Sequence, residues 1–95
     1  MTRIPQDLQG VLWSKNVSSL NLKQDKHYII HQVLMYGSLD HIDWLRSVYS
    51  NDEIKKVFIN KPRKVYTPQA FNLIKNYLLR IEADLPEKNY VKTIY

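Results

Sequence analysis

Cysteine is absent from the sequence, so the chain can form neither a disulfide bond nor a cysteine-based zinc site, and packing alone must hold its fold. Long apolar runs are also missing, because no stretch approaches the ~20 residues that a membrane-spanning helix needs. The first ten residues, MTRIPQDLQG, lack the apolar centre of a signal peptide. We therefore expect a cytoplasmic protein that has no association with a membrane.

Acidic residues are absent between Ile54 and Ile81, and this makes the charge of the chain lopsided. The basic residues of this stretch give it a charge of +7, and they are Lys55, Lys56, Lys61, Arg63, Lys64, Lys75 and Arg80. The rest of the chain carries −2, so the net charge is +5. A positive lobe of this kind attracts either nucleic-acid phosphates or an acidic protein surface.

The chain is short as well. Its 95 residues are enough for one domain that buries roughly 60 to 65% of the surface of its unfolded chain, with no room for a second core. Seven Tyr, two Trp and two Phe supply bulky side chains for that core. The sequence therefore predicts a single domain over residues 1–95.

Apolar side chains recur at helical spacing, which predicts an all-α cluster of about four helices, at about residues 24–36, 39–49, 51–59 and 68–83. The first helix has a wide apolar stripe formed by Ile29, Ile30, Val33, Leu34 and Tyr36. Gly37 predicts a left-handed stop after this helix. Ser38, which follows, is a favourable cap for the next helix.

The other three helices have similar buried lines. The second is expected to bury Leu39, Ile42, Leu45 and Tyr49, with Trp44 and Val48 beside them. The third is expected to bury Ile54, Val57 and Phe58. Thr67 and Pro68 are typical of a helix start, and the helix that follows should bury Phe71, Ile74, Leu78 and Ile81, with Tyr77 beside them.

The two ends of the chain show no clear periodicity. Residues 1–22 form an irregular N-terminal arm that is too apolar for a free tail, so we expect it to lie across the helices with Trp13 buried as an anchor. The tail, residues 85–95, is also more apolar than a solvated terminus needs. It either packs back on the domain, the reading that we favour, or forms an arm for a partner.

No group of residues has the pattern of a catalytic or metal site. His27 and His31 have the spacing of two metal ligands, but the zincin glutamate is missing and His41 is the only other histidine. We interpret these histidines as surface or core-edge residues. Asp40 and Asp43 fall in the first turn of a helix, where the helix dipole favours acidic residues. The sequence predicts a protein that is not an enzyme and has no cofactor.

The basic residues are the candidates for binding. Lys61, Arg63 and Lys64 lie in a loop that leads into a helix, where they could dock phosphates or an acidic partner. The full candidate set is Lys55, Lys56, Lys61, Arg63, Lys64, Tyr66, Lys75 and Arg80, in which Tyr66 could stack on a base. A solvated surface loop explains the loop cations equally well. A helix-turn-helix is less favoured, because the linker with Pro62 exceeds the usual turn.

Three segments carry a resemblance to a known family: LWS at Leu12 to Ser14, LNLKQDKHYIIHQVLMYGSLDHIDWL at Leu20 to Leu45, and VYSNDEIKKV from Val48. With them the chain resembles small bacterial helical proteins of unknown function over roughly Val11 to Leu79. Their pattern is an N-terminal LW or FW, an Ile-Ile helix, a Tyr-Gly turn and a Trp-Leu helix. Members are often encoded beside a nucleotidyltransferase toxin of the abortive-infection type.

The resemblance implies an antitoxin or accessory protein that binds such a nucleotidyltransferase through its basic half. A DNA-binding transcriptional regulator that uses the Lys55 to Lys64 region and the last helix is an alternative, and the two functions can coexist. A structural homo-oligomer with no regulated partner, such as a homodimer, is the third hypothesis.

Overall fold

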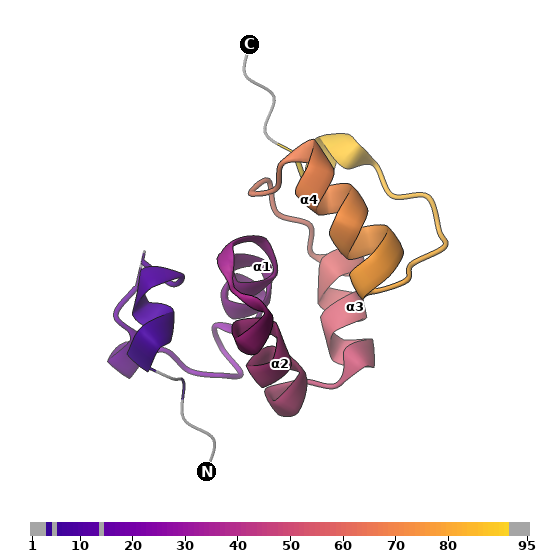
Figure 1. Ribbon diagram of the computed structural model, residues 1–95. Coiled ribbons are helices and arrows are strands. Elements are labelled where there is room, and N and C mark those ends of the chain that lie inside the picture. The colour runs from indigo at the N-terminus through magenta and orange to yellow at the C-terminus, as the bar shows by residue number, and fades with distance from the viewer. Residues whose placement is uncertain (1–3, 5, 14, 92–95) are drawn as a thin grey trace. The chain divides into compact units, whose positions relative to one another are not determined.

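The computed structural model describes residues 4, 6–13 and 15–91. Over these residues the fold is all-α, as predicted, with four α-helices, four short 3-10 or π segments and no strand. The chain divides into two compact units, Met1–Ser50 with α1 and α2, and Asn51–Tyr95 with α3 and α4 (Figure 1). None of the described helices is long and apolar enough to cross a membrane.

The N-terminal arm packs on the first unit, as predicted. It contains two 3-10 segments, η1 (Gln6–Gly10) and η2 (Val17–Ser19), and buries Leu8, Val11, Leu12 and Val17. The Gln9 amide organises the loop between these segments: Nε2 donates to the carbonyl oxygens of Leu12 at 3.2 Å and Lys15 at 2.9 Å, and Oε1 accepts from the Val17 amide at 2.9 Å.

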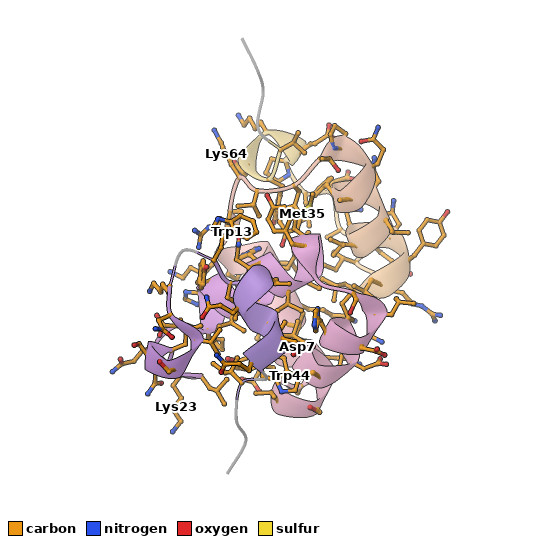
Figure 2. All side chains as sticks on the ribbon, turned by 60° about the vertical axis from the view of Figure 1, so that its left-hand side comes forward. Asp7, Trp13, Lys23, Met35, Trp44 and Lys64 are labelled. Atoms are coloured by element: carbon orange, nitrogen blue, oxygen red, sulfur yellow. The ribbon has the colours of Figure 1, made fainter. Side chains whose placement is uncertain are left out.

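The prediction that Trp13 anchors the arm is wrong. Its side chain is 55% exposed (Figure 2) and its ring lies edge-on against Tyr36, with 4.6 Å between ring centroids. The anchor is instead the fully buried Leu12, together with a hydrogen bond of 3.1 Å from Gln32 Nε2 to the Val11 carbonyl oxygen.

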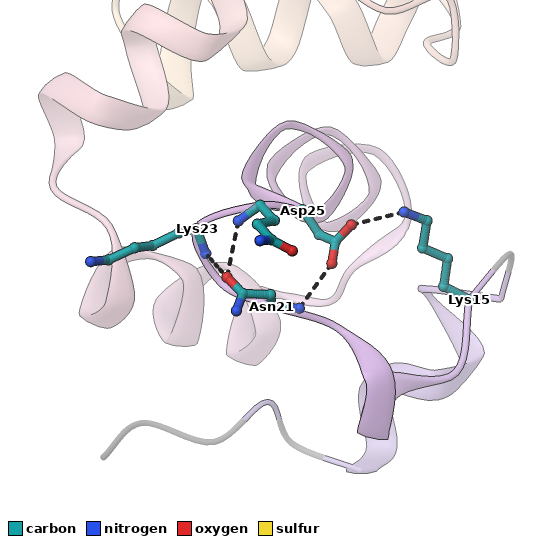
Figure 3. A network of polar contacts seen from close by, with 5 residues as sticks. Lys15, Asn21, Lys23 and Asp25 are labelled. Carbon is teal, nitrogen blue, oxygen red and sulfur yellow. Dashed lines mark hydrogen bonds and ion pairs between the residues drawn. The ribbon is translucent and has the colours of Figure 1, made fainter.

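A polar network precedes α1 (Lys26–Tyr36) and starts the helical turn (Figure 3). Asn21 Oδ1 accepts from the amides of Lys23 and Gln24 at 2.8 and 3.0 Å, as a capping side chain does. Asp25 Oδ2 accepts from the Asn21 amide and Oδ1 from Lys15 Nζ, both at 2.8 Å. The hydrogen bond from Asn21 and the Lys15 ammonium lower the pKa of the Asp25 carboxyl.

Gly37 ends α1, but the predicted left-handed conformation is wrong. Its φ is −76° and its ψ is 157°, which is extended backbone that any residue adopts. Space is the constraint: a Cβ at this position would lie 2.6 Å from the Val33 carbonyl oxygen and 3.0 Å from the Cβ of His41. Glycine is therefore required by space, chiefly beside the Val33 carbonyl oxygen of α1 itself and secondly beside His41 of α2.

The second helix, α2 (Leu39–Val48), begins with the predicted Ser38 cap. Ser38 Oγ accepts from the His41 amide at 3.3 Å, and His41 Nδ1 accepts from the Ser38 amide at 3.1 Å. Leu45 and Tyr49 are buried as predicted, but Leu39 is 79% exposed. Six α-helical residues turn the chain by about 600°, which places Leu39 about 120° away from Leu45.

The second unit is built around four aromatic rings that come from distant parts of its sequence. They are Phe58 of α3 (Asn51–Asn60), Tyr66 of the following loop, Phe71 of α4 (Pro68–Leu73) and Tyr90, which follows η4 (Glu87–Asn89). Tyr90 packs 4.8 Å from both phenylalanine rings, centroid to centroid, and its hydroxyl donates to the Phe58 carbonyl oxygen at 2.6 Å. Ile54 and Val57 complete the α3 side of this core.

The tail packs back on the second unit as far as Val91. The Tyr66 amide donates to the Tyr90 carbonyl oxygen at 3.0 Å, and Tyr66 forms an isolated parallel β-bridge with Val91. Tyr90 and Val91 are both buried, which confirms for these two residues the prediction that the tail packs on the domain. Ile94 and Tyr95 lie outside the described residues.

Each of α1, α2 and α3 begins and ends within two residues of its predicted bounds. The predicted helix 68–83, by contrast, is longer than the helix in the structure. It starts as predicted, because Pro68 occupies the first turn and Thr67 Oγ1 accepts from the Ala70 amide at 3.1 Å. The α-helix ends at Leu73 and continues as one π-helical segment, η3 (Ile74–Leu78). Arg80 then has a φ of 50°, which stops the helix in the left-handed region.

Candidate functional site

The basic loop between α3 and α4 contains Lys61, Arg63 and Lys64, three cations of the candidate set. The Lys61 amide still donates to the Val57 carbonyl oxygen at 2.9 Å, so this residue closes the last turn of α3. Pro62 then lacks the amide hydrogen that another turn needs. Lys61, Arg63 and Lys64 are all exposed in the segment that follows, which matches the predicted loop. On α3 itself, Lys56 is exposed and Lys55 is half-buried.

Tyr66 does not present its ring for stacking on a base. It is 2% exposed, and its ring centroid lies 5.6 Å from that of Phe58 and 6.3 Å from that of Tyr90. Burial, aided by the neighbouring Tyr90 phenol and partly opposed by the Arg63 charge, raises the pKa of the Tyr66 hydroxyl. The ring is a neutral core group that holds the end of the basic loop, so it leaves the set of binding candidates.

Lys75 and Arg80 lie at the other end of the second unit, where the last helix terminates. Lys75 is half-buried, and its Nζ donates to the Ile81 carbonyl oxygen at 3.2 Å and to Asn76 Oδ1 at 3.3 Å. The negative end of the helix dipole stabilises a lysine in the last turn of a helix. Arg80 is exposed. Lys75 is therefore partly structural, whereas the Arg80 side chain reaches solvent.

The same helix end forms a shallow concavity that the sequence did not predict. Its volume is about 480 Å³, and its lining consists of Lys75, Asn76, Tyr77, Arg80, Ile81 and Glu82. It combines two cations, an amide, a phenol and one carboxylate at its edge, which suits a ligand with both an anionic and an apolar part. Tyr77 was expected beside the buried face of a regular helix, and no signal in the sequence indicated a π turn.

The histidines and acidic residues of the first unit form no comparable site. His31 is buried in α1 whereas His27 is exposed, so their spacing does not bring both to one surface. His41 Nε2 lies 3.1 Å from Asp7 Oδ2, and its other ring nitrogen accepts from the Ser38 amide. Across the part of the chain that the structure describes, no three His, Asp or Glu residues are grouped to hold a metal ion.

The fold and these surfaces define a small all-α protein whose second unit carries an exposed basic loop and a basic concavity. A family model described as a family of unknown function, DUF6922, matches residues 8–58, which is more than half of the chain. The chain belongs to this family. Neither the search of the curated proteins nor the search of the solved structures found a match.

The matched region ends at Phe58 and does not extend to Leu79 as the resemblance led us to expect. It contains the arm from Leu8 onward, α1, α2 and most of α3, and therefore most of the residues with structural roles in the first unit. Of the candidate cations it includes only Lys55 and Lys56. The basic loop and the concavity lie beyond it.

Proposed function

We propose that the chain is a non-enzymatic antitoxin or accessory protein whose second unit binds an acidic surface of a nucleotidyltransferase toxin. The observation that carries this proposal is the exposure of Lys61, Arg63 and Lys64 on one loop, inside a stretch without any acidic residue from Ile54 to Ile81. The stretch contributes seven cations and no carboxylate, and such an excess of positive charge attracts an acidic surface.

The mechanism is occlusion of the partner's metal-binding carboxylates. Nucleotidyltransferases hold their catalytic metal ions on clustered acidic residues, and long Lys and Arg side chains on a protruding loop are able to enter such a cleft. Complementary charge of this kind mainly accelerates association and decides which partner is selected. The loop is held in place by the buried Tyr66 and by its hydrogen bond to the Tyr90 carbonyl oxygen, so little order is lost on binding.

The test begins with the genes beside this one: a nucleotidyltransferase encoded there is co-expressed with the chain, and the two purified proteins are then titrated, whereas a gene without such a neighbour would contradict the proposal. We expect a complex that weakens as salt rises, and we expect Arg63→Gln with Lys64→Gln to weaken it about tenfold. The matched comparison is between two single variants, Lys64→Gln in the loop and Lys23→Gln in the first unit, and Lys23→Gln should have little effect. An equal loss in these two variants, or no complex at all, would refute the proposal.

DNA binding is the second candidate, because the same cations precede a capped helix with exposed polar residues, Gln69, Asn72 and Asn76. This function predicts an affinity for duplex DNA that falls steeply with salt, with a slope that decreases by about one for each phosphate contact removed. Arg63→Gln with Lys64→Gln should flatten that slope. A slope near zero, or a protein that only self-associates in sedimentation experiments, would exclude a DNA-binding regulator and favour a homo-oligomer.

A further inference from the structure

The helix made by α4 and η3 has apolar side chains on two sides, and only one of these sides is buried. Phe71 and Ile74 pack into the core of the second unit. Leu73 and Tyr77 lie four residues apart, about one turn, and are 60% and 74% exposed. A helix that only covers a core needs polar residues on its outer side. Two large apolar residues one turn apart there indicate a surface that contacts a partner.

The π turn explains why Tyr77 faces outward. The Leu79 amide donates to the Ile74 carbonyl oxygen at 2.8 Å, one residue wider than an α-helical bond. This register buries Leu79. The α-helical spacing of the sequence predicted instead that Leu78 would be buried, but Leu78 is only half-buried. π turns and left-handed backbone at residues other than glycine, such as Arg80, are both concentrated at functional sites.

The charges beside these apolar residues are mainly positive. Arg80 lies beyond the end of the helix, and its side chain shares the lining of the concavity with Tyr77 and Lys75. The hydrogen bonds of Lys75 to Asn76 and to the Ile81 carbonyl oxygen hold this wall in shape. Glu82 is the single carboxylate of the lining. Leu73, Tyr77 and Arg80 therefore form a stripe, apolar at one end and cationic at the other, which we call the Leu73–Arg80 stripe.

We propose that the Leu73–Arg80 stripe binds an acidic amphipathic segment of a protein partner. Aliphatic side chains of that segment cover Leu73 and Tyr77, and a carboxylate pairs with the Arg80 guanidinium. The proposal rests on the proposed function, since it specifies how the acidic protein partner is held. A nucleic acid is disfavoured, because the exposed Leu73 offers an apolar contact for an aliphatic side chain but no stacking surface for a base.

The test measures binding of a fluorescein-labelled helical peptide to the full chain by fluorescence anisotropy. The peptide has leucines at positions i, i+3 and i+7 and glutamates elsewhere. We expect Leu73→Ala, Tyr77→Ala and Arg80→Gln each to weaken binding of this peptide, by about tenfold for Tyr77→Ala. Leu39→Ala is the matched control, because Leu39 is a leucine with even greater exposure in the first unit. Peptides with serine in place of leucine, or lysine in place of glutamate, should bind less tightly.

The outcomes separate this inference from the proposed function. If the peptide fails to bind, or if Leu73→Ala and Tyr77→Ala bind it as tightly as Leu39→Ala does, the stripe is not a docking site. Competition by a single-stranded oligonucleotide in a manner that depends on Tyr77 would assign the stripe to nucleic acid and overturn the inference. If the nucleotidyltransferase does not bind but the peptide binds through the stripe, the proposed partner is wrong and the inference stands.

Discussion

Replacement of Arg80 tests the backbone conformation that ends η3. A φ of 50° at a residue with a Cβ costs about 1 to 2 kcal/mol relative to the right-handed conformation, and glycine avoids this cost. Glycine also makes the unfolded chain more flexible, which opposes the gain by about 0.4 to 1 kcal/mol. We therefore expect Arg80→Gly to raise the free energy of unfolding of the second unit by up to about 1.5 kcal/mol.

Three further variants at the same position separate the backbone from the side chain. Arg80→Ala removes the guanidinium but keeps a Cβ, so we expect a change within about 0.5 kcal/mol. Arg80→Asn should give a smaller gain than glycine, because asparagine tolerates the left-handed region. Arg80→Val should destabilise, because a β-branched side chain is least tolerant of positive φ. The expected order of stability is Gly, Asn, then Arg and Ala together, then Val.

The assay is urea unfolding followed by near-ultraviolet circular dichroism of tyrosine, with tryptophan fluorescence recorded in parallel. Both tryptophans, Trp13 and Trp44, lie in the first unit, so their transition is an internal reference. Tyr66 and Tyr90 report on the core of the second unit. If Arg80→Gly is less stable than Arg80→Ala, the left-handed conformation is not a source of strain and the reasoning fails.

Three other predictions concern stability. Gly37→Ala should cost more than 1 kcal/mol, because its Cβ would lie 2.6 Å from the carbonyl oxygen four residues earlier, whereas Gly10→Ala has no atom within 4 Å and should be close to neutral in thermal unfolding. The pKa of Asp25 is lowered from 3.8, so its stabilisation is present above pH 3.8 and is lost as the pH falls through the folded value. Urea unfolding at several acidic pH values should therefore show a smaller loss for Asp25→Asn than for the unchanged protein. Tyr90→Phe should cost about 1 to 3 kcal/mol in chemical unfolding, since the buried Phe58 carbonyl oxygen loses its donor, and a neutral result would contradict the role of that bond.

The sequence was sufficient to predict the elements whose signals are local. The Ser38 cap and the Thr67-Pro68 start both appear as expected, because a cap depends on a few neighbouring atoms. Gly37 was located correctly as the end of a helix for the wrong reason. Glycine after a helix is compatible with positive φ and with close approach, and the two are distinguished by the observed φ of −76° and by the Val33 and His41 atoms close to the glycine.

The π turn could not be predicted, because its cause is not local. Residues 74–78 have an ordinary helical pattern in the sequence, whereas the structure has the wider register and buries Leu79 in place of Leu78. The same limit applies to Tyr66: its position after a run of cations indicated binding, whereas its ring is buried beside those of Phe58 and Tyr90 from elsewhere in the unit. The exposure of Lys61, Arg63 and Lys64 was predictable, since a charged loop that follows a helix rarely finds space in a core.

The place where the family match ends bears on how function should be assigned. The matched residues 8–58 supply the first unit and one side of the second core, and Phe58 at their limit packs against Phe71 and Tyr90 from the unmatched part. The basic loop and the Leu73–Arg80 stripe therefore belong to the portion that the family model does not cover, and so do Tyr66, Phe71 and Tyr90 of the second core. Membership of the family consequently says nothing about either surface, and the binding variants proposed for this chain have to be measured on this chain.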